Sequence, residues 1–514
     1  MAYLQSEFVR GQFTFNGTLT EDLANPNTTG DAFADFLLGF PEETQRQVGT
    51  AQAYLRNDSY AGYVQDDWQV AHNITLTAGL RYEYTSPFTE DRHNLLNLDY
   101  SNLPAQSTLQ PVNSAQTPNY RAFSPRVGVA VRLPHNSVFR AGYGIYYSQE
   151  IADETYDLLR NGVQTQINEP ASNVPVLTLA NGFPQTSSTG FPSYFGVDEN
   201  SRTPYVQQWT ASLQHELTRS TLLEIGYVGT KGTDLGLFRR FNTPAHVEIG
   251  QDLPPRPGNL QSLRTWPDLG TIFQLQHIGN SIYHSLQAKA EKRMTHGLSL
   301  LASFVWAKSI DDADSIVPGE FESFGAQDER NLRLERGLSF FDVRRRLAGG
   351  AVYSIPSLNY WRPLFSNWQT SGTFIFQDGT PLNPVYFATD FANSGTPNRP
   401  NVAPGVSVNL PASQRSADRF FNTAAFSDPA PYTFGDAGRD ILPGPGNAVV
   451  DLSLHRRFRI RERATFEIRA DSFNLLNHPN IGIPGPYPDF GPFFGKALSA
   501  GDPRRFQFGA RVDF

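Results

Sequence analysis

Strict alternation of apolar and polar residues is the feature that most limits what this chain can fold into. In residues 74–84 one set of alternate positions is apolar or aromatic, and the other set is Thr, Gly, Arg and Glu. The last stretch, PRRFQFGARVDF at 503–514, separates as completely and ends on Phe514. A helix would mix the two sets, because its side chains repeat about every 3.6 residues rather than every second residue. The sequence therefore predicts long strands with two chemically different faces.

The connections between these segments alternate in length. Tight turns at 71–73, 134–136, 219 and 295–297 join neighbouring segments, whereas polar stretches of about 25 to 70 residues separate the next ones; loops longer than about 15 residues are uncommon in compact soluble domains. A membrane barrel explains the alternation, because such barrels have short periplasmic turns, long extracellular loops and an even strand number. We therefore expect an all-β, antiparallel transmembrane β-barrel with about 14 strands in this chain.

That strand count depends on how three segments are interpreted. It takes the segment that begins at Val9 as a strand, residues 45–71 as one strand and residues 270–281 as loop. Residues 45–70 can also be read as two strands joined at 56–58. Two strands there, or an extra strand at 270–281, would however put a long loop on the side of the short turns. The regular alternation of long and short connections therefore favours one strand at 45–71 and a loop at 270–281. The short apolar run at 33–41 is expected to form a helical turn packed on a loop.

Composition excludes several other classes of protein. The 42 basic and 50 acidic residues give a net charge of −8, which does not favour a nucleic-acid partner. The absence of cysteine excludes disulfides and thiol chemistry. No run of about 18 apolar residues predicts a transmembrane helix, and the first residues, MAYLQSEFVRGQF, do not form a secretion signal. If the protein lies outside the cytoplasm, we expect its true amino terminus upstream of Met1.

Several stretches resemble the β-barrel of TonB-dependent outer-membrane receptors, in particular the Oar-like group. They are spread over nearly the whole chain, and their order and spacing make the match specific. They are FADFLLG at 33–39, YAGYVQDDW at 60–68, ITLTAGLRYEY at 74–84, LEIGYVGTKGTDL at 223–235, GNSIYHSLQAKAEKR at 279–293, FVWAKSIDDA at 304–313, FDVRRRLAGGAVYSIP at 341–356 and FEIRADSFNLLNHPN at 466–480.

The resemblance implies more than this chain contains. Receptors of this kind have a barrel of about 22 strands around a plug, and we expect the family's plug and TonB-contacting segment to be absent from residues 1–514. We therefore expect residues 1–514 to be a receptor barrel domain that is incomplete at its amino-terminal side. The resemblance also implies that Phe514 is the assembly signal read by the barrel-assembly machinery, and that contact with TonB is made only through the plug region.

The sequence contains no catalytic constellation, and no enzyme activity or cofactor is expected. The ten His residues are scattered, and no HExxH or G-x-S-x-G pattern occurs. Asp311, Asp312 and Asp314 in an external loop are weak candidates for a calcium site, since oxygen ligands suit a hard cation. They lack the glycine and distal glutamate of an EF-hand loop, so a solvated acidic loop is the competing interpretation.

The charged residues on the polar positions of the strands are the main candidate site. We expect them to face a wet lumen, where some would contact a plug, although pairing within the barrel wall is an equally good interpretation. Arg345, in contrast, is expected to face outward and to meet lipopolysaccharide phosphate. The lumen-facing set is Arg81, Glu83, Arg126, Arg132, Arg140, Asp451, Glu467, Arg469, Asp471 and Arg511.

The favoured function is therefore an outer-membrane receptor of a Gram-negative bacterium that captures a ligand and takes it up. The ligand cannot be read from loop residues such as Tyr194, Phe195, Trp266, Asn393 and Asn398, which suit oligosaccharides, peptides or chelates equally. Two alternatives remain: a passive diffusion channel of about 14 strands, and a secreted β protein that uses its loops for adhesion. In the membrane interpretations, outer-membrane lipid and lipopolysaccharide are the expected partners.

Overall fold

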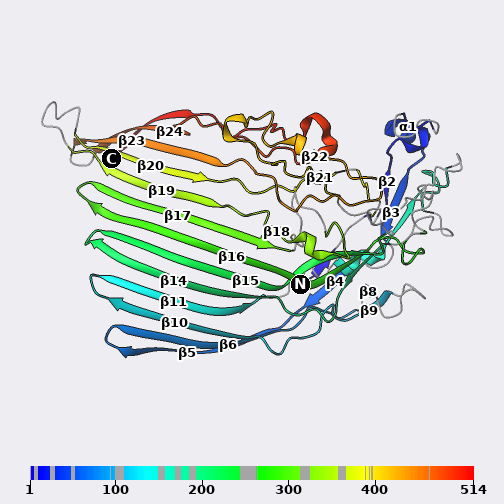
Figure 1. The fold of residues 1–514 in the computed structure, drawn as a ribbon, viewed down its shortest axis with the longest axis horizontal. Coiled ribbons are helices and arrows are strands. Elements are labelled where there is room, and N and C mark those ends of the chain that lie inside the picture. The colour runs from blue at the N-terminus through cyan, green and yellow to red at the C-terminus, as the bar shows by residue number, and fades with distance from the viewer. Residues whose placement is uncertain are drawn as a thin grey trace.

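The alternating segments form long strands that pair side by side in the computed structural model (Figure 1). The main sheet has 15 strands, of which β13 and β18 lie off the main path and the other 13 follow one another in chain order. The prediction of an all-β, antiparallel architecture is confirmed. The residues that the structure describes are 2–4, 8, 10–22, 29–47, 52–92, 94–98, 109–148, 155, 157–167, 175–183, 193–243, 262, 264–312, 325–356, 366–387, 389–392, 394, 398–461 and 464–514.

The 13 strands of the main path all pair antiparallel with their neighbours, and β13 (Tyr194–Val197) adds a parallel pairing to β16. β18 (Gly337–Leu338) pairs with the end of β17. The strands of the main path are β5 (Ser59–Ala71), β6 (Ile74–Thr85), β10 (Phe123–Leu133), β11 (Ser137–Tyr147), β14 (Tyr205–Thr218), β15 (Thr221–Phe241), β16 (Ile272–Thr295), β17 (Leu298–Asp311), β19 (Arg345–Ser354), β20 (Trp368–Gln377), β23 (Asn447–Arg461), β24 (Ala464–Phe473) and β25 (Arg505–Asp513).

The register gives the whole sheet two chemically distinct faces. Directly paired residues lie on the same face, and Ala78, Val127 and Tyr143 form one such row across three strands. The positions between them, such as Gly79 and Arg126, form rows on the opposite face. We call these the apolar face and the polar face. Many large side chains of the apolar face are exposed, as in Val127 at 55 %, so within the described residues no second protein layer covers these positions.

The two ends of the sheet differ as expected. The hairpin turns at 72–73, 134–136, 219–220 and 296–297 lie at one end, together with the carboxy terminus (Figure 1). Positive φ at His135, Asn136, His296 and Gly297 makes two of these turns tight. At Gly297 a Cβ atom would lie 2.7 Å from the carbonyl oxygen of Ser354, so glycine is required there. The long connections and the small sheets all lie at the other end.

Three expectations about individual strands are wrong. Residues 45–71 form no single strand: β3 (Glu43–Gln47) and β4 (Gln52–Arg56) belong to small sheets, and only β5 belongs to the main one. The break before β5 is fixed by two hydrogen bonds between Asp58 and Ser86. The segment after Val9 contributes only β2 (Gln12–Thr14), which pairs with β3. The main path therefore contains 13 strands rather than about 14.

The third wrong expectation is the loop over 270–281, since β16 already begins at Ile272. Its first residues pair with the last residues of β15, as in Ile272 with Phe241. Gln274 and Leu275 are adjacent, so their side chains point to opposite sides of the strand, yet both are buried, at 6 % and 1 % exposed. Other parts of the protein therefore cover this part of β16 on both sides. Burial on both sides removes the polar alternation that would have identified a strand.

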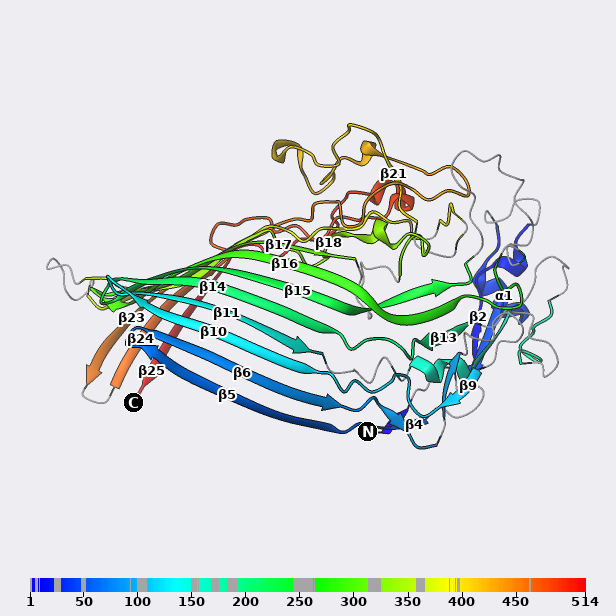
Figure 2. The same cartoon turned by 60° about the horizontal axis from the view of Figure 1, so that its bottom comes forward.

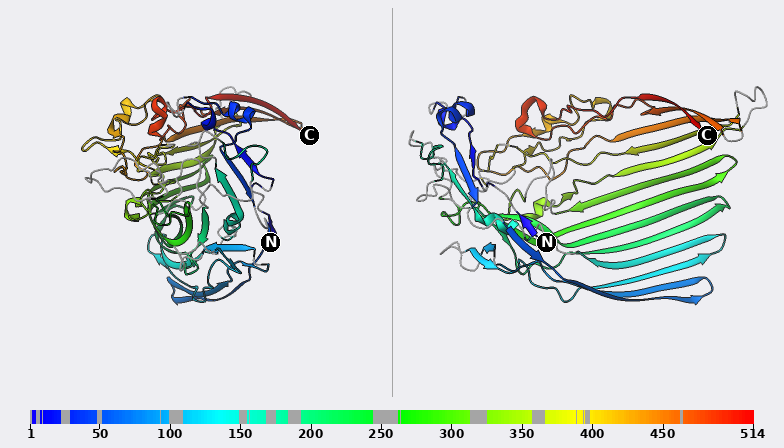
Figure 3. Two further views of the ribbon diagram at one scale, coloured as in Figure 1. Left: turned by 90° about the vertical axis from the view of Figure 1, so that its right-hand side faces the viewer. Right: turned by 180° about the vertical axis from the view of Figure 1, so that it is seen from behind.

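The main sheet curves into an open wall (Figures 2 and 3). Its strand order runs from β25 to β5, and no ladder joins these two edge strands among the residues that the structure describes. The expected barrel wall is thus present, and the part of the chain that the structure describes does not close it into a ring. Within the described residues, no helix is long and apolar enough to cross a membrane.

A loop layer of small elements packs on the long-loop end of the wall. The helix α1 (Ala32–Leu38) confirms the helical turn expected at 33–41; Asp31 caps its start by accepting a hydrogen bond from Ala34 N, and Gly39 ends it at φ 74°. The remaining elements are β1 (Ala2–Leu4), η1 (Thr18–Thr20), β7 (Thr89–Glu90), β8 (Leu95–Leu98), β9 (Leu109–Val112), η3 (Asp157–Gly162), β12 (Val163–Ile167), η6 (Leu332–Glu335), β21 (Asn401–Val402), η7 (Ala412–Gln414), η8 (Thr423–Ala425), β22 (Phe426–Ser427) and η9 (Pro488–Phe493).

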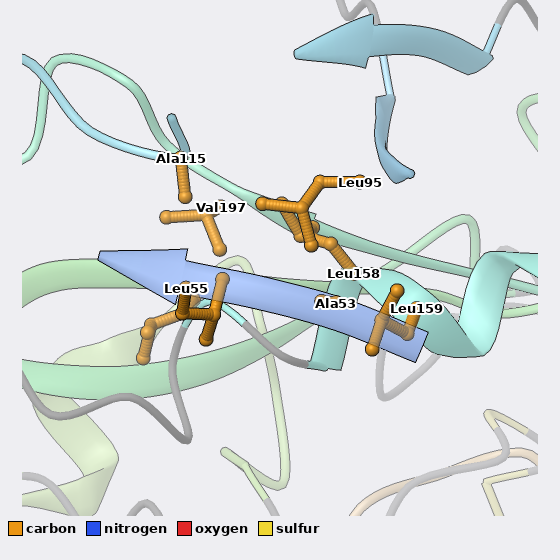
Figure 4. Close-up of a cluster of buried hydrophobic side chains, with 8 residues drawn as sticks. Ala53, Leu55, Leu95, Ala115, Leu158, Leu159 and Val197 are labelled. Atoms are coloured by element: carbon orange, nitrogen blue, oxygen red, sulfur yellow. The ribbon is translucent and has the colours of Figure 1, made fainter. Parts of the chain in front are cut away.

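The hydrophobic core of the molecule lies in this loop layer rather than in the wall. One cluster of fully or nearly fully buried side chains joins β4, β8, η3, β13 and β16 (Figure 4). A second cluster surrounds Phe421 and Leu442, and a third surrounds Ile272. Since buried apolar area is the main source of stability, the loop layer is a folded unit rather than a set of loose loops. The first cluster contains Ala53, Leu55, Leu95, Ala115, Leu158, Leu159, Val197 and Leu275.

Candidate ligand-binding surface at the long-loop end

The register places all ten residues of the expected lumen-facing set on the polar face. Arg126 pairs with Gly79 and Arg140 pairs with Ser212, both in rows of polar or small residues. At the other edge of the sheet, Glu467 pairs with Arg511. Their common face follows from strand register alone, whereas the lumen itself remains a prediction.

Most of these charges have partners within the wall. Arg81 pairs with Glu83 at 2.9 Å, Arg469 pairs with Asp471 at 2.7 Å, and Glu467 accepts from Arg457 at 2.6 Å. The others include Arg126, which stacks on Tyr146 at 4.7 Å, Arg140, which donates to Gln214 at 2.7 Å, Asp451, which accepts from Asn474 N at 2.9 Å, and Arg511, which pairs with Asp513 at 2.6 Å. The pattern agrees with the interpretation that these residues pair within the wall.

The three aspartates considered for calcium have different surroundings. Asp311 ends β17, is buried and forms an ion pair with Arg439, so its carboxylate already has a cationic partner. Asp312 accepts a hydrogen bond from Asn280 N. Asp314 lies outside the described residues. Among the residues that are described, no group of three or more His, Cys, Asp or Glu side chains gathers as a metal site would require.

Asp311 instead belongs to a buried polar network that joins two long loops. Both Nη atoms of Arg399 donate to the Glu335 carboxylate, at 2.9 and 3.1 Å. Gln327 N donates to Glu335 at 3.1 Å, and Arg439 Nε donates to the Glu335 carbonyl oxygen at 2.7 Å. The network links the β17–β19 loop to the β20–β23 loop, so the two loops form one unit.

Glu329 anchors the same unit to β15. Arg239 Nε lies 3.1 Å from its carboxylate, and Arg240 N donates to that carboxylate at 2.7 Å. Burial raises the pKa of Glu329 above its ordinary value, outweighing the hydrogen bonds and positive charges of the two arginines, which lower it. The long loops are therefore held on the wall at defined points.

The loop residues considered from the sequence as ligand contacts mainly stabilise the layer. Phe195 stacks on Phe273 with ring centroids 5.2 Å apart, and Asn398 is 1 % exposed. Trp266 N donates to the side-chain oxygen of Asn242 at 2.7 Å. Tyr194 begins β13 and is half-buried. Asn393 lies outside the described residues.

An exposed aromatic group in another part of the loop layer is the better candidate. Phe387 packs edge-on against Tyr487 and Phe490, with ring centroids 5.5 and 5.4 Å apart. Phe387 is nevertheless 70 % exposed and Phe490 41 % exposed. We call Phe387, Tyr487 and Phe490 the aromatic platform. An open cavity of about 820 Å³ adjoins it and is lined by Tyr487, Phe490 and Phe493.

Asp489 holds the platform in place. Its carboxylate accepts hydrogen bonds from Phe387 N at 3.1 Å and from Thr389 N at 3.2 Å. It therefore ties the β20–β23 loop to η9, which lies in the β24–β25 loop. The sequence reasoning missed this group, although the dense run YPDFGPFF at 487–494 is a local signal. Contact between Phe387 and residues about 100 positions away could not be read from that run.

Solved structures with a similar arrangement include the outer membrane transporter YddB from Escherichia coli, with 13 % identity, a TM-score of 0.46, and coverage of 92 % of this chain and 49 % of that one. The ferripyoverdine receptor of Pseudomonas aeruginosa has 11 % identity and a TM-score of 0.42, and the match covers 92 % of this chain and 39 % of that receptor. The siderophore receptor PiuA from Acinetobacter baumannii has 9 % identity and a TM-score of 0.42, and the match covers 92 % of this chain and 44 % of that receptor. This chain spans less than half the length of each of these proteins. No curated protein matches it.

The match to a protein family is much more extensive. The model of the outer membrane beta barrel domain matches residues 1–507, which is nearly the entire chain. This match agrees with the two-faced antiparallel wall and with the short turns at one end and the folded loop layer at the other. It also confirms the expectation of a membrane barrel rather than an enzyme. The chain therefore belongs to the outer membrane β-barrel family and is located in the outer membrane of a Gram-negative bacterium.

Proposed function

We propose that this chain is part of the barrel domain of a TonB-dependent receptor, which captures a ligand on its long loops and takes it up across the outer membrane. The observation that carries the proposal is the aromatic platform, which is exposed although it is built from two loops far apart in the sequence. Large exposed aromatic groups on a rigid support are typical of binding surfaces. Rings of this kind suit a ligand with a flat or apolar surface.

The remaining partners in the proposal follow from the family resemblance. Contact with TonB would be made through a plug region, and the barrel domain would extend beyond residues 1–514 on the amino-terminal side. The polar face, which carries Arg81, Arg126 and Arg140, would then border the transport path. Phe514 is 98 % exposed and follows directly on β25, where the barrel-assembly machinery could read it. Lipid and lipopolysaccharide would surround the apolar face.

A growth experiment in the native host tests uptake. Strains lacking this gene, or lacking TonB, are grown with ferric citrate as the only iron source, or with malto-oligosaccharides or a tryptic digest of casein as the only carbon source. The proposal expects that both deletions abolish growth on the same compound. If loss of this gene impairs growth on a compound while loss of TonB does not, the protein is a passive channel and the proposal is wrong.

A pair of variants tests the role of the aromatic platform. Phe387→Ser with Phe490→Ser should reduce growth on the compound identified above, because the exposed rings are lost while the buried network remains. Phe33→Ser is a matched control, since Phe33 is an exposed ring on α1 at 65 %. Equal growth of the platform variant and the control would remove the platform from the proposal.

A further inference from the structure

The sequence contains three Asn-Gly pairs, at 16–17, 161–162 and 181–182. In such a pair the backbone nitrogen of the glycine can attack the side-chain carbonyl carbon of the asparagine, because glycine has no Cβ atom to block the approach. The product is a five-membered succinimide ring, and the side-chain nitrogen leaves as ammonia. The reaction is helped by a base that takes the glycine N–H proton and by donors that stabilise the negative charge on the attacked oxygen.

Two of the three pairs are held away from this reaction. Asn161 is 7 % exposed, and its side-chain amide donates to Leu96 O and Phe195 O and accepts from Phe195 N at 2.6 Å. The side-chain oxygen of Asn181 accepts from the backbone N and the hydroxyl of Thr178, at 2.6 and 2.7 Å. Both asparagine side chains are therefore fixed on residues other than the glycine that follows them.

The third asparagine, Asn16, is directed at its own glycine. It lies between β2 and η1 and is exposed. Its side-chain oxygen accepts from Thr18 N at 3.0 Å and from Thr18 Oγ1 at 2.7 Å, which folds the side chain forward along the Gly17 peptide group. These two donors would stabilise the negative charge that develops on the oxygen during the attack. No residue in the described part of the chain accepts from the Asn16 NH2 group, so the leaving nitrogen is not held.

A buried carboxylate receives the backbone N–H of Gly17. Gly17 N donates to Asp35 Oδ2 at 2.8 Å, which is within the reach that a general base requires. Asp35 lies on α1 and is 0 % exposed. Its other oxygen, Oδ1, is buried and has no hydrogen-bond partner among the described residues. The Asp35 carboxylate can therefore take up a proton from Gly17 N without giving up another partner.

The backbone keeps these groups in place. Gly17 has a φ of 94°, and a Cβ atom at this position would lie 3.0 Å from Asp31 N, so glycine is required there. Asp31 is the N-cap of α1, and its backbone N donates to Thr20 Oγ1 at 3.1 Å, which joins α1 to η1. The base, the nucleophile and the oxyanion donors therefore belong to one folded segment.

We propose that Asn16 is a site of self-modification, where Asp35 and Thr18 promote conversion of the asparagine to aspartate and isoaspartate through a succinimide with Gly17. Gly17 N forms a bond to Asn16 Cγ and passes its proton to Asp35. The Cγ–Nδ2 bond breaks, and the Nδ2 group takes up that proton and leaves as ammonia. Water then opens the ring at Cγ, which gives aspartate, or at the backbone carbonyl carbon, which gives isoaspartate. One water is consumed and one ammonia is released, without any oxidant or reductant.

The modification would change the α1 region. It adds a negative charge to a segment in which Asp35 and Glu43 already help to raise the pKa of Glu42. Isoaspartate also lengthens the main chain by one atom between β2 and η1, so the hydrogen bond from Gly17 N to Asp35 would be lost or moved. Older copies of the protein should therefore carry a less stable α1 region than newly made copies. The inference does not depend on the proposed uptake.

Mass spectrometry of the full-length protein tests the inference. The protein is extracted from outer membranes in detergent and incubated at physiological pH and temperature, and deamidation is followed in the peptides that contain Asn16, Asn161 and Asn181. Asn16 in the folded protein should react at least about tenfold faster than the other two, and also faster than Asn16 in the same protein unfolded in urea. A reaction at Asn16 that is slower in the folded than in the unfolded protein would overturn the inference, because the fold would then protect this pair.

Variants separate the chemical roles from a general effect of structure. Asp35→Asn keeps an acceptor for Gly17 N but removes the base, and it should slow deamidation of Asn16 by about tenfold or more. Thr18→Val removes one oxyanion donor and should slow it less, because Thr18 N remains. Glu43→Gln removes an acid of the same region that lies on β3, and it should react as the wild type does.

Misfolding would not imitate the expected result. A loosened segment would lose the fixed geometry but would still allow the reaction of an unfolded Asn-Gly pair, so the rate in each variant is compared with that of the same variant in urea. The folded Asp35→Asn protein should be no faster than its unfolded form, whereas the folded wild type should be faster. Equal deamidation in the wild type and Asp35→Asn, or equal slowing by Asp35→Asn and Glu43→Gln, would overturn the role of Asp35 and with it the inference.

Discussion

Arg399 and Glu335 form a bidentate ion pair inside the loop layer, although they lie in two different long loops. The two N···O distances are 2.9 and 3.1 Å, and the side chains are 3 % and 8 % exposed. Neither residue can leave the pair without leaving a buried charge uncompensated. The pair therefore makes the β17–β19 and β20–β23 loops depend on each other.

Breaking this pair should loosen both loops. We expect Arg399→Met to lower the free energy of local unfolding by about 3–5 kcal/mol, because Glu335 remains buried without its partner. Hydrogen exchange should then speed up in both 325–344 and 398–440. The double variant Arg399→Met and Glu335→Met should lose much less of this free energy of local unfolding, since no charge is left unpaired. Faster exchange confined to the loop of the substituted residue would show that the loops are independent.

Asn97 clamps the free edge of β13. Its side-chain amide donates to Val197 O at 3.0 Å and accepts from Val197 N at 3.1 Å, and Asn97 itself is 3 % exposed. Asn97→Ala would leave two buried backbone groups unsatisfied, so we expect a loss of about 2–4 kcal/mol in local stability. Exchange of the Val197 amide measures this loss. Asn200→Ala, at an exposed position of the following turn, is the control and should leave that amide unchanged.

The α1 region should respond to pH through Glu42. Burial, followed by three neighbouring carboxylates, raises the pKa of Glu42 above its ordinary value of 4.5, and Glu42 Oε2 is buried without a hydrogen-bond partner. The folded segment thus binds this proton more tightly than the unfolded segment does. Its stability should be highest below the ordinary carboxyl pKa and should fall as the pH rises through the raised value.

Hydrogen exchange of the backbone amides of 31–42, corrected for the intrinsic pH dependence of exchange, tests the predicted loss of stability with rising pH. Protection in the wild type should decrease between about pH 4.5 and pH 7.5, and Glu42→Gln should remove much of that decrease because the amide does not ionise. Glu43→Gln tests whether any neighbouring acid has the same effect. A pH dependence that persists unchanged in Glu42→Gln would show that another group is responsible.

A charge on the apolar face should impair insertion. Ile225 lies in the middle of that face on β15 and is 50 % exposed. We expect Ile225→Arg to cost about 2–4 kcal/mol of stability in a bilayer, as measured by urea-dependent folding into lipid vesicles. Gln214→Arg places the same side chain on the polar face and should cost far less. Equal costs at the two positions would contradict the assignment of the faces.

The sequence allowed the wall to be predicted well where each strand has one wet and one apolar side. The hairpin of β10 and β11 follows the expected turn at 134–136, and all ten polar-face charges lie on one face. Register depends on this local alternation and on short turns, both of which are visible in sequence. For the same reason Arg345 could be placed on the apolar face before the structure was known.

Where loops cover a strand on both sides, prediction failed. At Gln274 and Leu275, whose side chains point to opposite sides of β16, both side chains are buried, so the alternation of polar and apolar residues disappears. The order of long and short connections favoured one strand over residues 45–71, yet β3, β4 and β5 pair in three different sheets. The break between β4 and β5 lies where the alternative two-strand interpretation placed it, at 56–58. The aromatic platform depends on contacts between Phe387 and η9 that only the folded loop layer creates. Contacts at such sequence separations leave no local periodic signal.

The absence of cysteine permits a direct measurement of the two faces. Single substitutions to Cys at Ile225, Leu286 and Leu347 on the apolar face, and at Glu224, Gln287 and Ala348 on the polar face, would carry nitroxide labels in outer-membrane vesicles. Collision rates with oxygen, which concentrates in lipid, and with a water-soluble nickel chelate are then compared. We predict that oxygen collisions dominate at the first three positions and chelate collisions at the other three. Similar collision rates at both sets would contradict a wall with lipid on its apolar face and water on its polar face.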